Sequence, residues 1–172
     1  MTRWMWLALL LCGVMWAQEP AAKPAAGAGK KAATKAAAEP KKSMFGPDEI
    51  PFGPPPPFVQ PGAQMAVIEG NPMGATGDYT VRIKMPAGYQ IAPHWHPKQE
   101  NVTVLSGTLK VGMGDKMDES KMQSFPAGSF AGVPPKMHHY AMADGETTIQ
   151  IHGMAPLKIN YINPADDPSK KK

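Results

Sequence analysis

The chain has 172 residues, a formal net charge of +4 and one cysteine, Cys12. This length predicts a single domain of ordinary size. A lone cysteine so close to the start excludes a disulfide framework, and it excludes Cys-His catalysis once the first residues are removed.

The first seventeen residues have the pattern of a secretory signal peptide. A basic start, Met1 to Arg3, precedes an apolar stretch from Trp4 to Trp16 and then Ala17. This stretch is shorter than the about 20 residues that span a bilayer, so we expect cleavage after Ala17 and no transmembrane helix in the mature chain. Lipid attachment at Cys12 is the alternative. Either way the protein is expected to be exported, and to be periplasmic or secreted.

Residues 18–43 are almost wholly Ala, Pro, Lys, Gly and Glu, which predicts a disordered linker. Residues 166–172 form a basic tail. The segment between these flanks, 44–167, has eight basic and twelve acidic residues, so the positive charge belongs to the flanks. The lysines of the flanks have no aromatic neighbours, which argues against nucleic acid as a partner.

Residues 44–61 are rich in proline and are predicted to form an extended arm. Phe45, Phe52 and Phe58 are candidates to anchor this arm on the following domain. The same arm could cross to a second copy of the chain, so a homodimer is possible. The alternative is that it is a ligand for a proline-recognition domain.

From residue 62 to residue 165, short apolar-polar runs alternate with turn residues, which predicts an all-β sandwich or barrel. Residues 118–122 are the only stretch expected to turn helically. The predicted strands cover residues 65–69, 79–84, 90–94, 101–105, 108–113, 129–133, 140–142, 147–152 and 157–162.

Two histidine-bearing segments stand out in this domain. His94 and His96 are two residues apart, so on a strand their side chains leave the same face, and Glu100 keeps the same parity. Farther along the chain, His138 and His139 follow a Pro-rich turn. Imidazole and carboxylate ligands without a thiolate suit one divalent transition metal, Fe, Mn, Zn, Ni or Cu. The sequence does not choose among these five metals.

The pattern Gly88-x5-His94-x-His96-x3-Glu100-x6-Gly107 resembles the first conserved motif of the cupin superfamily. The second motif is matched more loosely by Pro126, Gly128 and the two adjacent histidines, and its final asparagine is absent. The resemblance is to small, single-domain (type 2) bacterial cupins, here with an export signal. It implies a cupin jelly roll, a double-stranded β-helix barrel, with the metal inside one end. It also implies His94, His96, Glu100 and His139 as metal ligands, with His138 as the alternative to His139.

Three further residues are candidates for a role in the pocket. Gln150 and His152 share one face of a predicted strand, and they would line the pocket if that face points inward. If it points outward, Ile149 and Ile151 fill the core instead. Tyr140 could donate a hydrogen bond to a bound substrate, or it could serve in packing.

These features lead to two functional hypotheses. The first is an exported, metal-dependent enzyme that resembles an oxygenase, or an isomerase or decarboxylase, and acts on a small anionic, enolic or phenolic compound. The second is a non-catalytic module of the cell envelope that binds or senses a small molecule through the metal. The residues alone do not choose between them.

Overall fold

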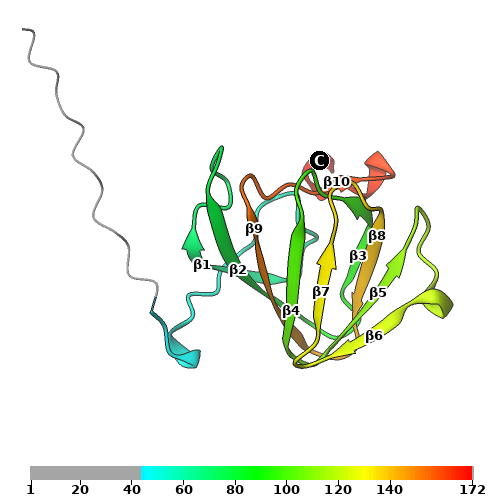
Figure 1. The fold of residues 1–172 in the computed structure, drawn as a ribbon. Coiled ribbons are helices and arrows are strands. Elements are labelled where there is room, and N and C mark those ends of the chain that lie inside the picture. The colour runs from blue at the N-terminus through cyan, green and yellow to red at the C-terminus, as the bar shows by residue number, and fades with distance from the viewer. Residues whose placement is uncertain (1–43, 172) are drawn as a thin grey trace, which may run out of the picture. The chain divides into compact units, whose positions relative to one another are not determined.

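The computed structural model describes residues 44–171, so the predicted signal peptide and linker lie outside the described part of the chain. Two antiparallel sheets face each other, as Figure 1 shows. The first sheet has the order β1-β2-β9-β4-β7, formed by β1 (Gln64–Gly70), β2 (Asp78–Met85), β9 (Thr147–Met154), β4 (Glu100–Ser106) and β7 (Phe130–Val133). The second has the order β10-β3-β8-β5-β6, formed by β10 (Asn160–Tyr161), β3 (Gln90–Trp95), β8 (His139–Ala143), β5 (Thr108–Met113) and β6 (Gln123–Pro126). The predicted all-β jelly roll is confirmed.

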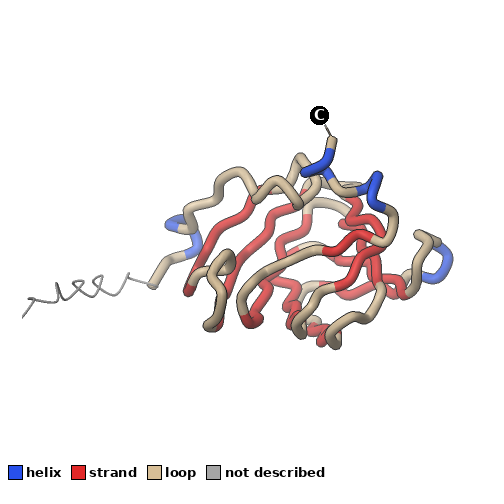
Figure 2. Tube along the Cα trace, turned by 90° about the horizontal axis from the view of Figure 1, so that it is seen from above, coloured by secondary structure: helices blue, strands red, loops and turns tan. Residues whose placement is uncertain are grey.

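Helical structure within residues 44–171 is limited to short 3-10 turns, which lie at the periphery of the sheets in Figure 2. One of them, η2, falls inside the segment where a helical turn was expected. None of the helices in this part of the chain is long and apolar enough to cross a membrane. The turns are η1 (Pro47–Glu49), η2 (Glu119–Lys121), η3 (Pro164–Asp166) and η4 (Pro168–Lys170).

One strand, β6, was not predicted. Its sequence Gln-Ser-Phe-Pro has a single large apolar side chain, Phe125, and therefore no alternation to recognise. Pairing with β5 defines it, with Phe125 opposite Leu109. The last predicted strand, residues 157–162, shortens to the two residues of β10.

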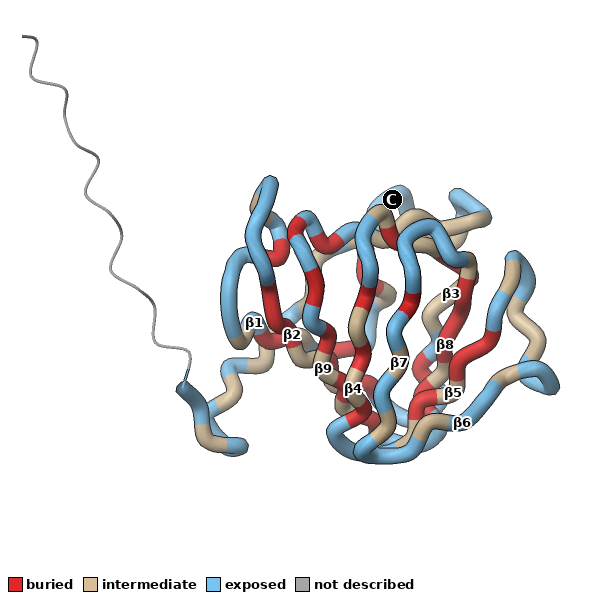
Figure 3. The backbone as a smooth tube through the Cα atoms, in the orientation of Figure 1, coloured by how far each residue is buried: buried red, intermediate tan, exposed pale blue. Residues whose placement is uncertain are grey.

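The core lies between the two sheets. Buried and more exposed residues alternate along β4 and β9, as Figure 3 shows, because successive side chains of a strand point to opposite faces. Val102 and Val104 on β4 and Ile149 and Ile151 on β9 therefore face the second sheet. This inner face supplies most of the apolar burial that stabilises the fold.

The proline-rich arm contacts the barrel of its own chain. Gly53 forms an isolated bridge with Met65 of β1, and Phe58 packs against the core. Phe52 is half-buried, and Phe45 is 36% exposed.

Gly107, the last glycine of the histidine motif, turns the chain from β4 into β5. Its φ is 73°, in the left-handed region that only glycine adopts without strain. A Cβ at this position would also collide with the backbone of Glu146. The motif thus requires glycine here for two independent steric reasons.

Candidate metal centre

A bulge in β3 sets the direction of the two motif histidines. The register between β3 and β8 shifts between Ile91 and His94, and the shifted segment contains Pro93, which has no N–H to donate to the ladder. Ile91, His94 and His96 consequently all face the space between the sheets. The prediction that His94 and His96 share a face agrees with this arrangement.

Three buried imidazoles converge at one end of the barrel. His94 and His96 come from β3 and the residue that follows it, and His139 comes from the start of β8. One ring nitrogen from each lies within 4.8 Å of the others. Of the two adjacent histidines at the second motif, it is therefore His139 that joins the cluster.

Each imidazole is held by a hydrogen bond from Nδ1 to a backbone carbonyl. His94 donates to Ala92 at 2.7 Å, His96 to Lys158 at 2.8 Å and His139 to Met137 at 3.1 Å. A carbonyl oxygen only accepts, so the proton of a neutral ring sits on Nδ1 and the lone pair on Nε2 is free. Metal-binding histidines commonly show this arrangement, because the Nδ1 bond fixes both the tautomer and the ring orientation.

The free nitrogens fit a metal ion. Nε2 of His96 is buried and has no hydrogen-bond partner, which costs free energy unless something else satisfies it. Burial first, and then repulsion by His139 and His96, lowers the pKa of His94 to about 3. His94 is therefore neutral near pH 7, as a metal ligand must be.

Glu100, the first residue of β4, adds a carboxylate to the cluster. Its Oε2 lies 3.5 Å from Nε2 of His96 and 3.6 Å from Nε2 of His139. Burial alone would raise the pKa of Glu100, but the electrostatic influence of His96 and His139 outweighs it and lowers the pKa to about 2. The distances are compatible with shared ligation, since two ligands each about 2.1 Å from one ion can lie up to about 4.2 Å apart.

His138 lies outside the cluster. Its side chain is 41% exposed, and its Nδ1 bonds to the carboxylate of Asp115. Neighbouring residues entering β8 point to opposite faces, so only one of the two histidines can face the interior.

A cavity of about 260 Å³ lies between the sheets directly beside the cluster. His94, His96, Glu100 and His139 form one part of its wall. Met113 and Gly132 also line it and are exposed to solvent, so the cavity reaches the surface near the cluster.

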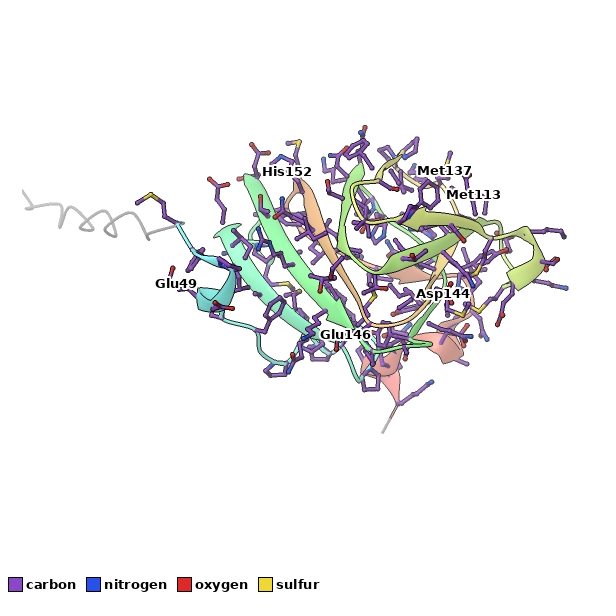
Figure 4. The ribbon with its side chains drawn as sticks, turned by 90° about the horizontal axis from the view of Figure 1, so that it is seen from below. Glu49, Met113, Met137, Asp144, Glu146 and His152 are labelled. Carbon is purple, nitrogen blue, oxygen red and sulfur yellow. The ribbon has the colours of Figure 1, made fainter. Side chains whose placement is uncertain are left out.

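The inward orientation considered for Gln150 and His152 is wrong. The side chains of Ile149 and Ile151 line the cavity, so the residues that alternate with them on β9 face outward. The Gln150 side chain accepts a hydrogen bond from Arg82, and the His152 ring bonds to the Thr80 hydroxyl. Figure 4 shows His152 apart from Met113 and Met137. His152 is next to Gly153, which pairs with Glu100, so it lies level with the cluster along the strands but its ring is on the outer face.

Tyr140 has a packing role. It follows His139 on β8 and so points to the outer face of the second sheet, where its ring covers Gly112. The side chain is fully buried, and its hydroxyl donates to the carbonyl of Asp118 at 3.2 Å. A hydrogen bond from Tyr140 to a substrate in the cavity is excluded by this direction.

No sequence pattern predicted the polar side chains that line the rest of the cavity. Tyr89 and Gln60 lie there, and the ring of Tyr161 lies 6.1 Å from that of His94. These residues come from a turn, the proline-rich arm and the short strand β10, so no periodic pattern links them. Tyr79 on β2 does not line this cavity. Burial first, and then the charge of Glu100, raises its pKa to about 12.

The fold was compared with solved structures. RemF, a polyketide cyclase from Streptomyces resistomycificus, matches with a TM-score of 0.58 and 14% identity over 76% of this chain and 92% of RemF. KdgF from a Halomonas species matches with a TM-score of 0.51 and 21% identity over 69% of this chain and 96% of KdgF. An RmlC-like cupin from Shewanella frigidimarina also has a TM-score of 0.51, with 16% identity over 66% of this chain and 91% of that cupin. At such low identities the similarity concerns the fold.

Curated protein sequences contain no significant match to the chain. The family of ChrR cupin-like domains, in contrast, matches residues 44–158, which include both histidine segments and the arm. The two sheets and the jelly-roll neighbours agree with that match. The chain therefore belongs to the ChrR cupin-like domain family.

Proposed function

We propose that His94, His96, His139 and Glu100 bind one divalent transition-metal ion, and that a small molecule reaches this ion through the adjoining cavity. The observation that supports the proposal most is the free Nε2 of His96, buried without a partner beside two further imidazoles fixed in the same way. A ligand set of nitrogen and oxygen without sulfur suits Fe, Mn, Zn, Ni or Cu.

The electrostatics favour an anionic or enolisable oxygen donor as the small molecule. Three neutral imidazoles and one carboxylate leave a divalent site with a formal charge of about +1. When bound, the ion supplies Lewis acidity and open coordination positions. The protein holds the three imidazoles in place through their Nδ1 hydrogen bonds to backbone carbonyls.

We propose an exported enzyme that resembles an oxygenase, acting on a small anionic, enolic or phenolic compound. An isomerase or decarboxylase would use the same four residues. Glu100 is the one carboxylate that lines the cavity among the described residues, so proton transfer by the protein in such a reaction depends on it.

A second candidate is a non-catalytic module that binds or senses a ligand through the metal. The tyrosine hydroxyls and the amide that line the cavity are all bonded to backbone carbonyls. They are therefore not free to act as acids or bases. This observation favours simple binding over a reaction that needs several proton transfers.

The metal is tested by elemental analysis of native protein purified without chelator, beside His96→Ala and the matched control His138→Ala. We expect about one ion per chain in the native protein and in His138→Ala, and none in His96→Ala. Equal metal content in all three proteins would contradict the proposal.

Turnover separates the two candidate functions. The metal-loaded protein is incubated under oxygen with a panel of small anionic, enolic and phenolic compounds. Consumption that is lost in His96→Ala supports the enzyme. Saturable, metal-dependent binding without any consumption supports the binding module.

Export is part of the proposal and rests on the first seventeen residues. Mass spectrometry of the mature N-terminus tests it. A chain that begins at Gln18 supports cleavage after Ala17, and a chain that begins at acylated Cys12 supports the lipid-anchored alternative. Full-length protein in the cytoplasm would contradict both.

A further inference from the structure

The inner surface of the barrel becomes apolar at the next inward-facing residues, two positions along the strands from the metal ligands. On β4 the inward-facing residue after Glu100 is Val102, which lies opposite Ile151 of β9. On β8 the inward-facing residue after His139 is Ala141, which lies opposite Val111 of β5. We call the four ligand residues the metal end and the deeper set the apolar floor, which comprises Val102, Leu109, Val111, Ala141, Ile149 and Ile151.

Small side chains on both sheets leave space in the cavity. Ala141 on β8 and Ala131 on β7 both line the cavity, and they come from opposite sheets. A larger residue at either alanine would fill part of the space.

The polar side chains that line the cavity outside the metal end already form hydrogen bonds within the protein. Tyr89 donates its hydroxyl to the carbonyl of Gln60, and Tyr161 donates to the carbonyl of Phe58 at 2.9 Å. The amide of Gln60 donates to the carbonyl of Asp166 at 2.7 Å. Within residues 44–171, both tyrosine hydroxyls that line the cavity beyond the four ligands already donate to backbone carbonyls, and so does one N–H of the Gln60 amide.

From these three observations we infer that the ligand of the metal has an apolar body, about the size of one substituted aromatic ring, which rests on the apolar floor. The inference rests on the proposed metal site, because the ion binds the oxygen-bearing head of the ligand. The cavity of about 260 Å³ exceeds the ~150 Å³ apolar cavity that accommodates benzene in an engineered protein. A sugar-like body with several hydroxyls would lose its hydrogen bonds to water and find no partners on the floor.

The test uses three hydroxamates that share one metal-binding head and differ in the body. Acetohydroxamate has almost no body, benzohydroxamate has an apolar ring, and nicotinohydroxamate has a ring of the same size that carries a polar nitrogen. Binding to the zinc-loaded protein is measured by calorimetry. We expect benzohydroxamate to bind at least about tenfold more tightly than acetohydroxamate, the gain for burying an apolar ring. Nicotinohydroxamate should fall between them.

Two variants reduce the cavity from opposite sheets, Ala141→Leu and Ala131→Leu. Each should abolish the advantage of benzohydroxamate and leave both the zinc content and the binding of acetohydroxamate unchanged. The matched control is Ala127→Leu, because Ala127 is exposed and does not line the cavity. It should keep the advantage in full. If one of these two leucine variants does not fold, the other is enough for the test.

The outcomes separate this inference from the metal proposal. If zinc binds but the three hydroxamates have equal affinities, or if both filled variants keep the preference, the apolar body is wrong and the metal site stands. If zinc does not bind, toluene binding to the metal-free protein is followed by NMR. Binding that is lost in Ala141→Leu then supports the apolar floor, and no binding to the wild type overturns it.

Discussion

The metal end and the apolar floor are neighbouring layers of the same strands, yet they stabilise the molecule in different ways. At the metal end Nε2 of His96 is buried without a hydrogen-bond partner, which costs free energy that a bound ion would offset. On the floor, side chains such as Ile149 and Ile151 are buried among other apolar residues. The difference teaches that a step of two residues along a strand separates the candidate metal ligands from apolar residues that stabilise the fold.

The largest effect on stability is expected from the floor. Ile149→Ala removes a side chain that is only 3% exposed, and we expect the metal-free protein to lose about 2–5 kcal/mol of unfolding free energy. Denaturant unfolding measures the loss, and elemental analysis should still find one ion per folded chain. A loss of metal that matches the loss of stability would mean that the two layers are not separable.

The metal end should affect stability through the ion. At a free metal concentration of one hundred times Kd, binding adds about 2.7 kcal/mol to the unfolding free energy. His96→Ala should lack this gain. In the absence of metal, it should differ from the wild type by only about 1 kcal/mol, the worth of the hydrogen bond to Lys158. Thermal melts with and without chelator test both statements, and a metal-induced shift that persists in His96→Ala would contradict them.

Unfolding at alkaline pH tests how much Tyr161, which lines the cavity, contributes to stability. Burial first, and then the charges of Asp167 and Asp166, raise the pKa of Tyr161 to about 12 from 10.0. Because the folded-state pKa is the higher one, the contribution of Tyr161 is complete below pH 10 and is lost as the pH rises through about 12.

The hydroxyl of Tyr161 is only partly buried, so we expect this loss to be about 1 kcal/mol. Unfolding of the wild type and of Tyr161→Phe is compared between pH 9 and pH 12. The variant should show the smaller decline, although Tyr89 still titrates in both proteins. Equal declines would show that Tyr161 does not contribute.

The smallest effect is expected at His138, the exposed neighbour of a metal-end residue. His138→Ala breaks a surface pair with Asp115 and should change the unfolding free energy by less than about 0.5 kcal/mol. Its metal content should equal that of the wild type. A loss of metal in His138→Ala would show that the assignment of His139 as the second-motif ligand is wrong.

The sequence predicted the features that depend on local spacing. The two-residue step between His94 and His96 and the glycine at position 107 are properties of a strand and a turn, and both are found in the fold. The choice of His139 over His138 came from a family resemblance, and strand parity in the structure agrees with it.

Features that depend on packing between distant segments were not accessible from the sequence. Strand alternation showed that Gln150 and Ile151 face opposite ways, but it could not show which of them faces inward. The cavity could not be predicted either, because its volume depends on small residues such as Ala131 and Ala141, which lie on opposite sheets. β6 was missed because its partner strand, rather than its own composition, determines it.

Because the hydrogen bond from His96 to the carbonyl of Lys158 spans a long stretch of chain, we expect it to form late in folding. The first motif becomes fixed only when a residue 62 positions farther along the chain has arrived. Contacts of such long range form slowly, because loop closure must precede them. Metal uptake by a refolding chain should therefore follow closure of the barrel, and a bound ion marks a domain that has finished folding.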